Sequence, residues 1–208
     1  METAPYSLSY QRVGRLGDSE FKLQSKLPDL SLRLPRYEDM GALLAILRNK
    51  ANSKFDKSIY AASNQELKEI AQRWTTLSQP LAYLTFLIWH NDVPVGIAGL
   101  GWIGLANENQ AESDPSRAGA AGVMIEPAAR GKGYAYKALR MVFDYGLCEL
   151  GLVEIRVSTH SKNVSMQMLM EQKFGLEAER HIGDQVDKFG NDLFWVVTTE
   201  NLAGSTSK

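Results

Sequence analysis

Apolar side chains recur along this chain at two spacings, and these spacings predict alternating helices and strands. Residues 40–47 and 67–77 follow the three-to-four spacing of amphipathic helices. Ser63 and Glu66 form a capping-box pattern before the second of these helices, and Pro80 follows it. The pattern therefore predicts a pair of helices in the first half of the chain.

Short apolar runs bounded by turn residues predict the strands. The runs lie at residues 32–34, 83–89, 95–103, 118–125, 152–158 and 193–198. His90, Asn91 and Asp92 join the second run to the third, which is typical of a hairpin. Two further helical patterns, at residues 134–150 and 166–174, separate the last three strands.

These patterns divide the chain into one domain and two flanking segments. Residues 1–30 are polar and lack a clear period, so we expect an N-terminal extension there. Residues 31–203 are expected to form a single domain, followed by a flexible tail at residues 204–208. Residues 105–116 are polar and rich in Asn, Glu and Asp, which predicts a mobile loop.

Composition and charge narrow the class of protein. The chain has 208 residues with 44% hydrophobic content, which is enough to bury a full core. Its formal charge of −1 gives no basic excess for nucleic acid. Cys148 is the only cysteine, which excludes an internal disulfide and suits a reducing compartment. No apolar run approaches the roughly 20 residues that span a bilayer. We therefore expect a cytoplasmic protein that binds neither nucleic acid nor membrane.

The segment 123–135 combines a buried strand, two glycines and the start of a helix. Gly131 and Gly133 allow positive φ and let a ligand approach the backbone closely. At a helix N-terminus, unpaired N–H groups and the positive end of the helix dipole favour an anion. Arg130 and Lys132 add positive charge. The segment predicts a phosphate-binding turn, although two glycines alone also fit an ordinary strand-to-helix connection.

Two familiar phosphate loops do not fit this segment. A Walker loop needs Ser or Thr after Gly-Lys, but Gly133 follows Gly131 and Lys132 here. A dinucleotide fingerprint needs a third glycine, and an acidic residue at the end of a second strand about 20 residues on. Glu154 lies near that distance, but it falls inside a predicted strand and the third glycine is missing.

The segment instead resembles motif A of the GNAT N-acetyltransferase superfamily. That motif reads Gln or Arg, two residues, Gly, one residue, and then Gly or Ala, and Arg130, Gly133 and Ala135 match it. Further along, residues 152–158 resemble the fifth strand of the family. Asn163 resembles its cofactor-contacting asparagine.

The resemblance runs from residue 83 to residue 197. Residues 174–176 are similar to the family's Gly-Phe ending, and residues 190–195 to the last strand of the RimJ/RimL-like ribosomal-protein-alanine N-acetyltransferases. The resemblance implies an α/β (α+β) fold: a single GNAT-like domain with a mixed, mostly antiparallel sheet. The family's sheet has about seven strands, splays between strands 4 and 5, and is flanked by about four helices.

The same resemblance implies how acetyl-CoA would be held as co-substrate. The pantetheine arm would pair with backbone of the fourth strand, and amides of the glycine turn would bind the pyrophosphate. The expected cofactor-contacting residues are Val123, Met124, Ile125, Arg130, Gly131, Lys132, Gly133, Tyr134, Ala135 and Asn163. Asn163 fits the N-cap of its helix equally well, and the two roles are compatible. No metal is expected.

The catalytic acid and base are not evident from the motifs. Many family members have Glu midway along the fourth strand, but residues 118–122 contain no carboxylate. Others have Tyr as general acid in the helix after the asparagine, where this chain has Met170. The spacing from Asn163 to Gly175 is also one residue longer than usual. Both departures put the usual acid and base in doubt.

Three other side chains are candidates for the base. His160 ends the polar face of the fifth expected strand and has a suitable unperturbed pKa, about 6.5. Glu154 shares that face, and Glu126 precedes the glycine turn. The alternatives are a surface position for His160, an ion pair of Glu154 with Arg156, and a solvated turn for Glu126. Positioning alone can also contribute several kcal/mol, roughly 7–11 at best.

The sequence thus predicts an acetyl-CoA-dependent N-acetyltransferase that transfers acetyl directly to a primary amine. The amine belongs to a protein N-terminus or to a small molecule, and the sequence does not decide between them. The alternative within the same fold is a non-catalytic acyl-CoA-binding module. A third class is a phosphate-binding scaffold for another nucleotide. The exposed edge of such a sheet also allows a homodimer.

Overall fold

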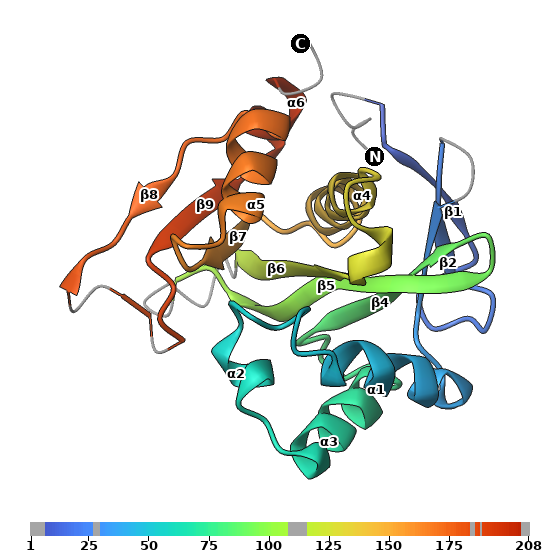
Figure 1. Cartoon of the computed structure of the whole chain (residues 1–208). Coiled ribbons are helices and arrows are strands. Elements are labelled where there is room, and N and C mark those ends of the chain that lie inside the picture. The colour runs from blue at the N-terminus through green and yellow to red at the C-terminus, as the bar shows by residue number, and fades with distance from the viewer. Residues whose placement is uncertain (1–6, 27–29, 108–115, 184–185, 188, 205–208) are drawn as a thin grey trace.

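An open sheet of nine strands organises the described part of the chain (Figure 1). The computed structural model describes residues 7–26, 30–107, 116–183, 186–187 and 189–204. The strands are β1 (Tyr10–Val13), β2 (Lys22–Ser25), β3 (Leu30–Arg33), β4 (Leu84–His90), β5 (Val93–Leu105), β6 (Arg117–Ile125), β7 (Glu154–Thr159), β8 (Glu179–Arg180) and β9 (Leu193–Val197). The α-helices are α1 (Met40–Arg48), α2 (Lys57–Tyr60), α3 (Asn64–Trp74), α4 (Tyr134–Cys148), α5 (Val164–Gln167) and α6 (Thr199–Gly204).

The described residues also include three short helical segments of other types, η1, η2 and η3. Two are 3-10 turns, η1 (Tyr37–Asp39) and η2 (Pro127–Ala129), and the third, η3 (Met168–Lys173), is a π-helix. The strand order is β1-β2-β3-β4-β5-β6-β7-β9-β8, and every pair is antiparallel except the parallel pair β6–β7. The predicted α/β class and mixed, mostly antiparallel sheet are confirmed.

The described residues form nine strands and six α-helices, against the six apolar runs and four helical patterns recognised in the sequence. The additional strands include β1 and β2, which lie within residues 1–30, where only an extension was expected. Each has four residues and one fully buried position, so neither carries enough alternation to be recognised in the sequence. The remaining additions, β8, α2 and α6, are two, four and six residues long. The parts of the expected loop and tail at 108–115 and 205–208 lie outside the described residues.

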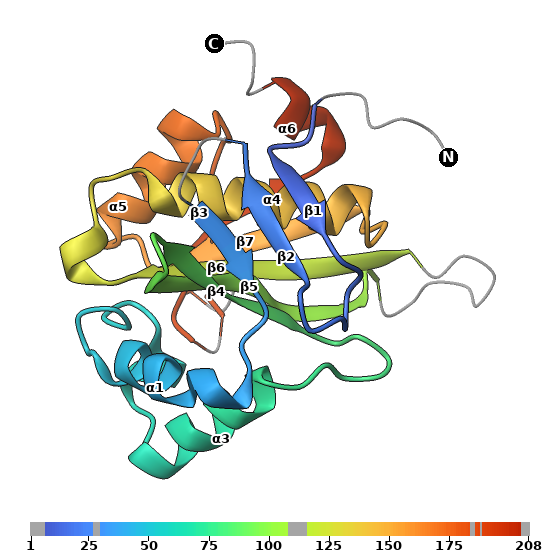
Figure 2. The ribbon, with the colours of Figure 1, turned by 90° about the vertical axis from the view of Figure 1, so that its right-hand side faces the viewer.

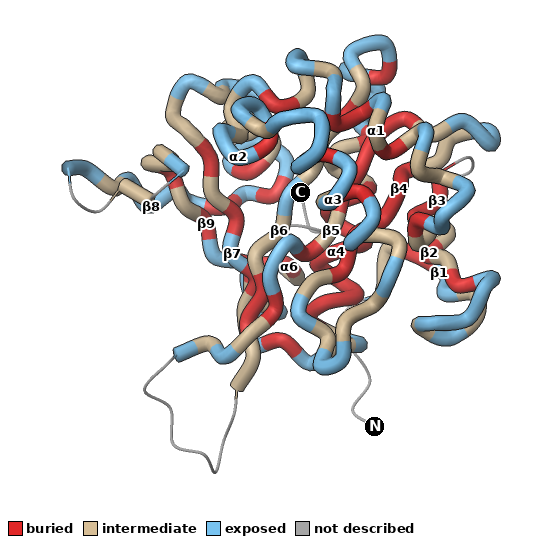
Figure 3. Tube along the Cα trace, turned by 90° about the horizontal axis from the view of Figure 1, so that it is seen from below, coloured by how far each residue is buried: buried red, intermediate tan, exposed pale blue. Residues whose placement is uncertain are grey.

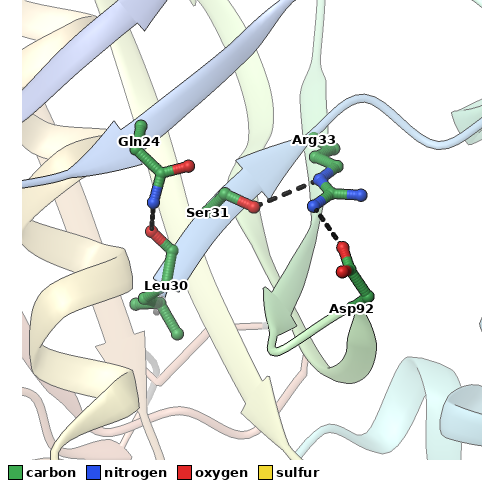
Figure 4. A network of polar contacts seen from close by, with 5 residues as sticks. All are labelled: Gln24, Leu30, Ser31, Arg33 and Asp92. Carbon is green, nitrogen blue, oxygen red and sulfur yellow. Dashed lines mark hydrogen bonds and ion pairs between the residues drawn. The ribbon is translucent and has the colours of Figure 1, made fainter. Parts of the chain in front are cut away.

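Polar contacts join the N-terminal strands to the rest of the sheet (Figure 4). Gln24 on β2 donates to the carbonyl of Leu30 at 3.0 Å. Arg33 on β3 donates to the Ser31 hydroxyl at 3.2 Å and to the Asp92 carboxylate at 2.9 Å. Asp92 lies in the β4–β5 turn with positive φ, as the predicted hairpin requires. These bonds fix β2, β3 and the hairpin relative to one another.

Helices cover both faces of the sheet. In Figures 1 and 2, α4, α5 and α6 lie on one side and α1, α2 and α3 on the other. Phe143 of α4 is fully buried in the larger core, and Leu43 of α1 in the smaller one. Burying side chains of this size contributes about 1.5–3 kcal/mol each. Figure 3 shows burial concentrated in the central strands and α4, whereas the outer turns of α2 and α3 are exposed.

Candidate active site

The sheet opens between β6 and β7, where the splay was predicted. The two strands pair only over residues 118–120 and 154–156. Beyond that point β6 continues along β5 as far as Ile125, while β7 continues along β9. A parallel pair that separates in this way leaves a gap within the sheet, with backbone polar groups along its sides.

The direction of the β6 backbone groups follows from two hydrogen bonds. The Arg117 carbonyl accepts from Val153, so odd-numbered residues of β6 present their backbone groups toward β7. The Glu126 amide donates to a β5 carbonyl at 2.9 Å, so even-numbered residues face β5. Val123 therefore directs its N–H and C=O groups into the gap, and Ile125 its N–H, whereas the Ile125 carbonyl accepts from Arg130 at 2.9 Å. An extended ligand placed there would find donors and acceptors at β-sheet spacing.

A tight turn follows β6 and leads into α4. Gly131 and Gly133 have φ of 78° and 77°, and both lie in open space, because a Cβ at either position would meet no atom within 4 Å. Gly133 is the N-cap of α4, which has 15 residues. The N–H groups of the first turn have no partner within the helix, and the helix dipole is positive there. The turn is thus an open, backbone-lined site suited to an anion.

The side chains around this turn have different environments. Lys132 is exposed beside the glycines, and Ala135 is half-buried. The ring of Tyr134 is buried against His90, with the ring centroids 4.8 Å apart, so only its backbone can face a ligand. On β6, Met124 packs toward α1 and α3, opposite to its odd-numbered neighbours.

The Arg130 guanidinium holds the turn in place. It donates to the Ile125 carbonyl at 2.9 Å, to the Ala51 carbonyl at 2.8 Å and to Asn52 Oδ1 at 3.0 Å. Its side chain therefore joins the end of β6 to the segment after α1. This position differs from the expected one, in which the charge was placed beside a phosphate.

The Glu126 carboxylate contacts the same segment. Its Oε2 accepts from Asn49 at 3.0 Å and its Oε1 from Asn52 at 2.6 Å. The side chain is half-buried, so Glu126 is not the solvated turn residue of the alternative interpretation. Asn49 and Asn52 were missed by sequence reasoning, since only the fold brings them to partners more than 70 residues away.

The other two candidate bases, Glu154 and His160, also accept hydrogen bonds from nearby groups. Glu154 accepts from Arg156 Nε at 2.7 Å and lies where β6 and β7 still pair, away from the gap. His160 Nδ1 accepts from the Lys162 amide at 3.0 Å, so a neutral imidazole carries its proton on Nε2. His160 thus uses the lone pair of its neutral imidazole in this bond, and Glu154 pairs with Arg156 at a place away from the gap.

Asp192 lies near His160 and accepts from the Ser161 amide at 2.6 Å. Burial raises the pKa of Asp192, but hydrogen bonds from Ser161 and the proximity of His160 outweigh this, so its pKa lies below the ordinary value. Asp192 therefore remains ionised at neutral pH.

Asn163 caps α5, as one interpretation of the sequence required. Its Oδ1 accepts from the Met166 amide at 3.4 Å and its Nδ2 donates to Thr159 at 2.9 Å. The extra residue between Asn163 and Gly175 falls in the segment that contains the π-helix, where the Phe174 amide donates to the carbonyl five residues earlier. Met170, at the position expected for a Tyr acid, is fully buried.

Comparison with known families places the chain in one of them. The acetyltransferase (GNAT) domain matches residues 29–177, which is more than half of the sequence. The chain therefore belongs to the GNAT acetyltransferase family, as its motifs predicted. A search of curated protein sequences gives no match.

Solved acetyltransferases share the fold. RimL, a ribosomal-protein alpha-N-acetyltransferase in complex with coenzyme A, has a TM-score of 0.65 and 15% identity, over 83% of this chain and 95% of that one. Spermidine N-acetyltransferase from Vibrio cholerae, in complex with CoA and spermine, has a TM-score of 0.66 and 18% identity over 85% and 99%. MccE, a microcin self-immunity acetyltransferase in complex with acetyl-CoA and AMP, has a TM-score of 0.63 and 13% identity over 83% and 93%. At such identities the likeness shows the fold.

Among the described residues, no three or more His, Cys, Asp or Glu side chains gather in a way that could hold a metal ion. No helix in these ranges combines the length and the apolar character needed to cross a membrane.

Proposed function

We propose that this protein is an acetyl-CoA-dependent N-acetyltransferase that transfers acetyl directly to a primary amine. One observation carries the proposal. The gap beside Val123 and Ile125 leads along β6 to two open, left-handed glycines at the N-terminus of a long helix. Backbone polar groups spaced as in a β-sheet therefore line the gap, and they lead to a turn suited to an anion. CoA, with an extended pantetheine arm and a pyrophosphate, has the matching chemistry.

The cofactor would be held mainly by backbone groups. Val123 and Ile125 would pair with the amides of the pantetheine arm, with Met124 between them. The N–H groups of residues 131–135 would bind the pyrophosphate, with Lys132 beside it. Asn163 already uses its side chain as a cap, so we assign it the role of holding the start of α5 beside the gap. Arg130 would act on the turn and not on the phosphate.

When bound, acetyl-CoA supplies a thioester whose carbonyl carbon the amine attacks. A C–N bond forms, the C–S bond breaks, and the CoA sulfur leaves as a thiolate that takes up a proton. Backbone N–H groups of β6 facing the gap are suited to stabilise the charge that develops on the carbonyl oxygen. The amine approaches from the α1–α3 face, because the glycine turn and α4 occupy the other face.

We propose that no side chain of the three candidates acts as the base. The Nδ1 lone pair of His160 accepts from the Lys162 amide. Glu154 pairs with Arg156 away from the gap, and the Glu126 carboxylate holds the segment after α1 through Asn49 and Asn52. The protein would then bind the amine in its neutral form, already deprotonated in solution, and orient it for attack. Holding reactants in near-attack geometry can contribute roughly 7–11 kcal/mol, which makes such a mechanism sufficient.

This mechanism predicts a particular pH dependence. With a peptide α-amine of pKa about 7.7–8.0 as acceptor, kcat/KM should rise about tenfold per pH unit from pH 6 to the pKa of the amine. His160→Ala should change kcat/KM by less than about threefold, since the imidazole would not take the proton. The measurement is kcat/KM against pH for both proteins. A plateau above pH 6.5 that His160→Ala removes would instead make His160 the base.

The acceptor is a protein N-terminus or a small amine. RimL acts on a ribosomal protein and the Vibrio cholerae enzyme on spermidine, so this fold accommodates both classes. The second candidate function is a non-catalytic acyl-CoA-binding module. It is favoured by the burial of Met170 and by the engagement of all three candidate bases. Tight binding of acetyl-CoA without release of free thiol across a peptide and amine panel would support it.

A thermal-shift titration with acetyl-CoA tests the cofactor. At 100 times its Kd, a ligand bound only by the folded state adds about 2.7 kcal/mol of stability. For a chain of this length the expected rise in Tm is about 5–10 °C. ATP and NAD serve as controls. An equal rise with ATP or NAD would favour a scaffold for another nucleotide, and no rise with acetyl-CoA would refute the proposal.

A further inference from the structure

The segment after α1 crosses the open end of the gap. We call residues 49–60 the strap. At one end Asn52 is held by Glu126 and Arg130, which follow β6. At the other end the Lys57 side chain lies against Gly190, just before β9. Figures 1 and 3 both place α2, the end of the strap, between α1 and the arm formed by β8 and β9.

The far contact belongs to the β7 side of the gap. Asn191, next to Gly190, donates to the Ser158 hydroxyl of β7 at 3.2 Å, and Asp192 donates through its amide to Thr159 at 3.2 Å. The strap therefore spans from the end of β6 to the end of β7. It lies on the α1–α3 face, from which the amine would approach.

Asn52 is the central residue of the contact with the glycine turn. Its Nδ2 donates to Glu126 Oε1 at 2.6 Å and to the Ile46 carbonyl at 3.0 Å, while its Oδ1 accepts from Arg130 at 3.0 Å. Every polar atom of this amide is thus bonded, in two cases to a charged partner. Hydrogen bonds to charged groups contribute about twice as much as neutral ones. We call Asn52, Glu126 and Arg130 the latch.

We infer that the latch couples the cofactor turn to the acceptor side of the site, so that binding of CoA stiffens the strap. This inference rests on the proposed function. Arg130 immediately precedes Gly131, the first residue of the turn that would bind the pyrophosphate. A ligand that fixes the turn therefore also fixes the residues that hold Asn52. Asn52, Glu126 and Arg130 are positioning residues, which act on the acceptor through the strap.

Coupling of this kind has a measurable consequence for hydrogen exchange. If the strap opens only when the turn is released, a ligand bound to the turn must dissociate before strap amides exchange. Exchange then slows by a factor that approaches 1 + [L]/Kd, or about 100 at 100 times Kd. If the strap opens alone, the factor is one. The amides of Asn52, Asp56 and Tyr60 report on this, since each donates a backbone hydrogen bond within the strap.

The experiment is amide hydrogen exchange of the full chain with and without CoA at 100 times Kd. In the wild-type protein, exchange at the amides of Asn52, Asp56 and Tyr60 should slow at least tenfold. In the double variant Asn49→Ala and Asn52→Ala, only the bond from Arg130 to the Ala51 carbonyl still joins the strap to the turn. At the same saturation, the slowing of the strap amides by CoA should fall at least threefold below that of the wild type, while the first turn of α4 remains protected. Glu126→Ala, which removes the bonds to both Asn49 and Asn52, is the second variant, with a loss in the same direction, should the double variant fail to fold.

The matched control is Gln65→Ala. Gln65 on α3 donates to the Glu69 carboxylate at 2.9 Å, an amide-to-carboxylate bond like that of the latch but outside it. This variant should behave as the wild type. Protection of the turn without protection of the strap, or undiminished strap protection in both latch variants, would overturn the latch alone. No protection at either place would overturn the proposed function and the latch with it.

Discussion

Replacing Gly133 by valine is expected to raise the Kd for CoA at least about 100-fold. Gly133 has φ of 77° and open space where its Cβ would stand, at the N-cap of α4. A branched side chain would occupy the space reserved for the pyrophosphate. Valine is also strained at positive φ and would turn the first N–H groups of the helix away. Two hydrogen bonds to a charged group contribute about 3 kcal/mol, which corresponds to about 100-fold in Kd.

Isothermal calorimetry with CoA measures this effect, and Gly151→Val is the matched control. Gly151 follows the other end of α4, has φ of 67° and also lies in open space. Both substitutions should lower stability by about 1–3 kcal/mol through backbone strain. Only the change at Gly133 should weaken CoA binding. Equal affinity in Gly133→Val and wild type would remove the glycine turn from the proposed site.

Replacing Asp144 by alanine is expected to lower the free energy of unfolding by about 3–5 kcal/mol. Asp144 is fully buried on α4 and accepts from Arg140 Nε at 3.0 Å and from the Ser9 amide at 2.8 Å. Alanine would leave the buried guanidinium without its carboxylate and the Ser9 amide without its acceptor. Because Ser9 directly precedes β1, the N-terminal hairpin should also become more accessible.

Chemical denaturation measures the stability, and hydrogen exchange of β1 measures the hairpin. Glu149→Ala is the control, since Glu149, the C-cap residue of the same helix, pairs with Arg12 in a more exposed position. Exposed ion pairs contribute at most about 1 kcal/mol. Replacing Arg140 and Asp144 together by apolar residues should cost less than Asp144→Ala, because no buried charge remains. A loss below 1 kcal/mol for Asp144→Ala would show that this pair does not stabilise the helix.

Local chemistry explains why much of the fold was predictable. Ser63 and Glu66 form the capping box that the sequence indicated, and Asn91 and Asp92 form the turn of a hairpin. These features depend on residues within a few positions of one another. The glycine turn was predictable for the same reason, since its positive φ values need only Gly131 and Gly133.

The chemistry of the candidate bases was not predictable in the same way. His160, Glu154 and Glu126 have suitable groups, but their positions in the fold and their hydrogen-bond partners decide whether they can take a proton from the amine. Glu126 meets Asn52 across 74 positions, and no local pattern indicates such a pair. His160 is an instructive exception, because its partner is only two residues away, yet the bond depends on backbone geometry that the sequence does not reveal.

The sequence by itself determined the family, the α/β class, the glycine turn and most of the central strands and helices. These follow from local periodicity, caps and turns, which act over a few residues. Only the tertiary structure decided that β1 and β2 extend the sheet, that the predicted separation of β6 from β7 begins after Ala120, and that Asn52 joins the strap to the glycine turn. Each depends on contacts between distant parts of the chain, whose free energy is set by packing and hydrogen bonding in the folded molecule.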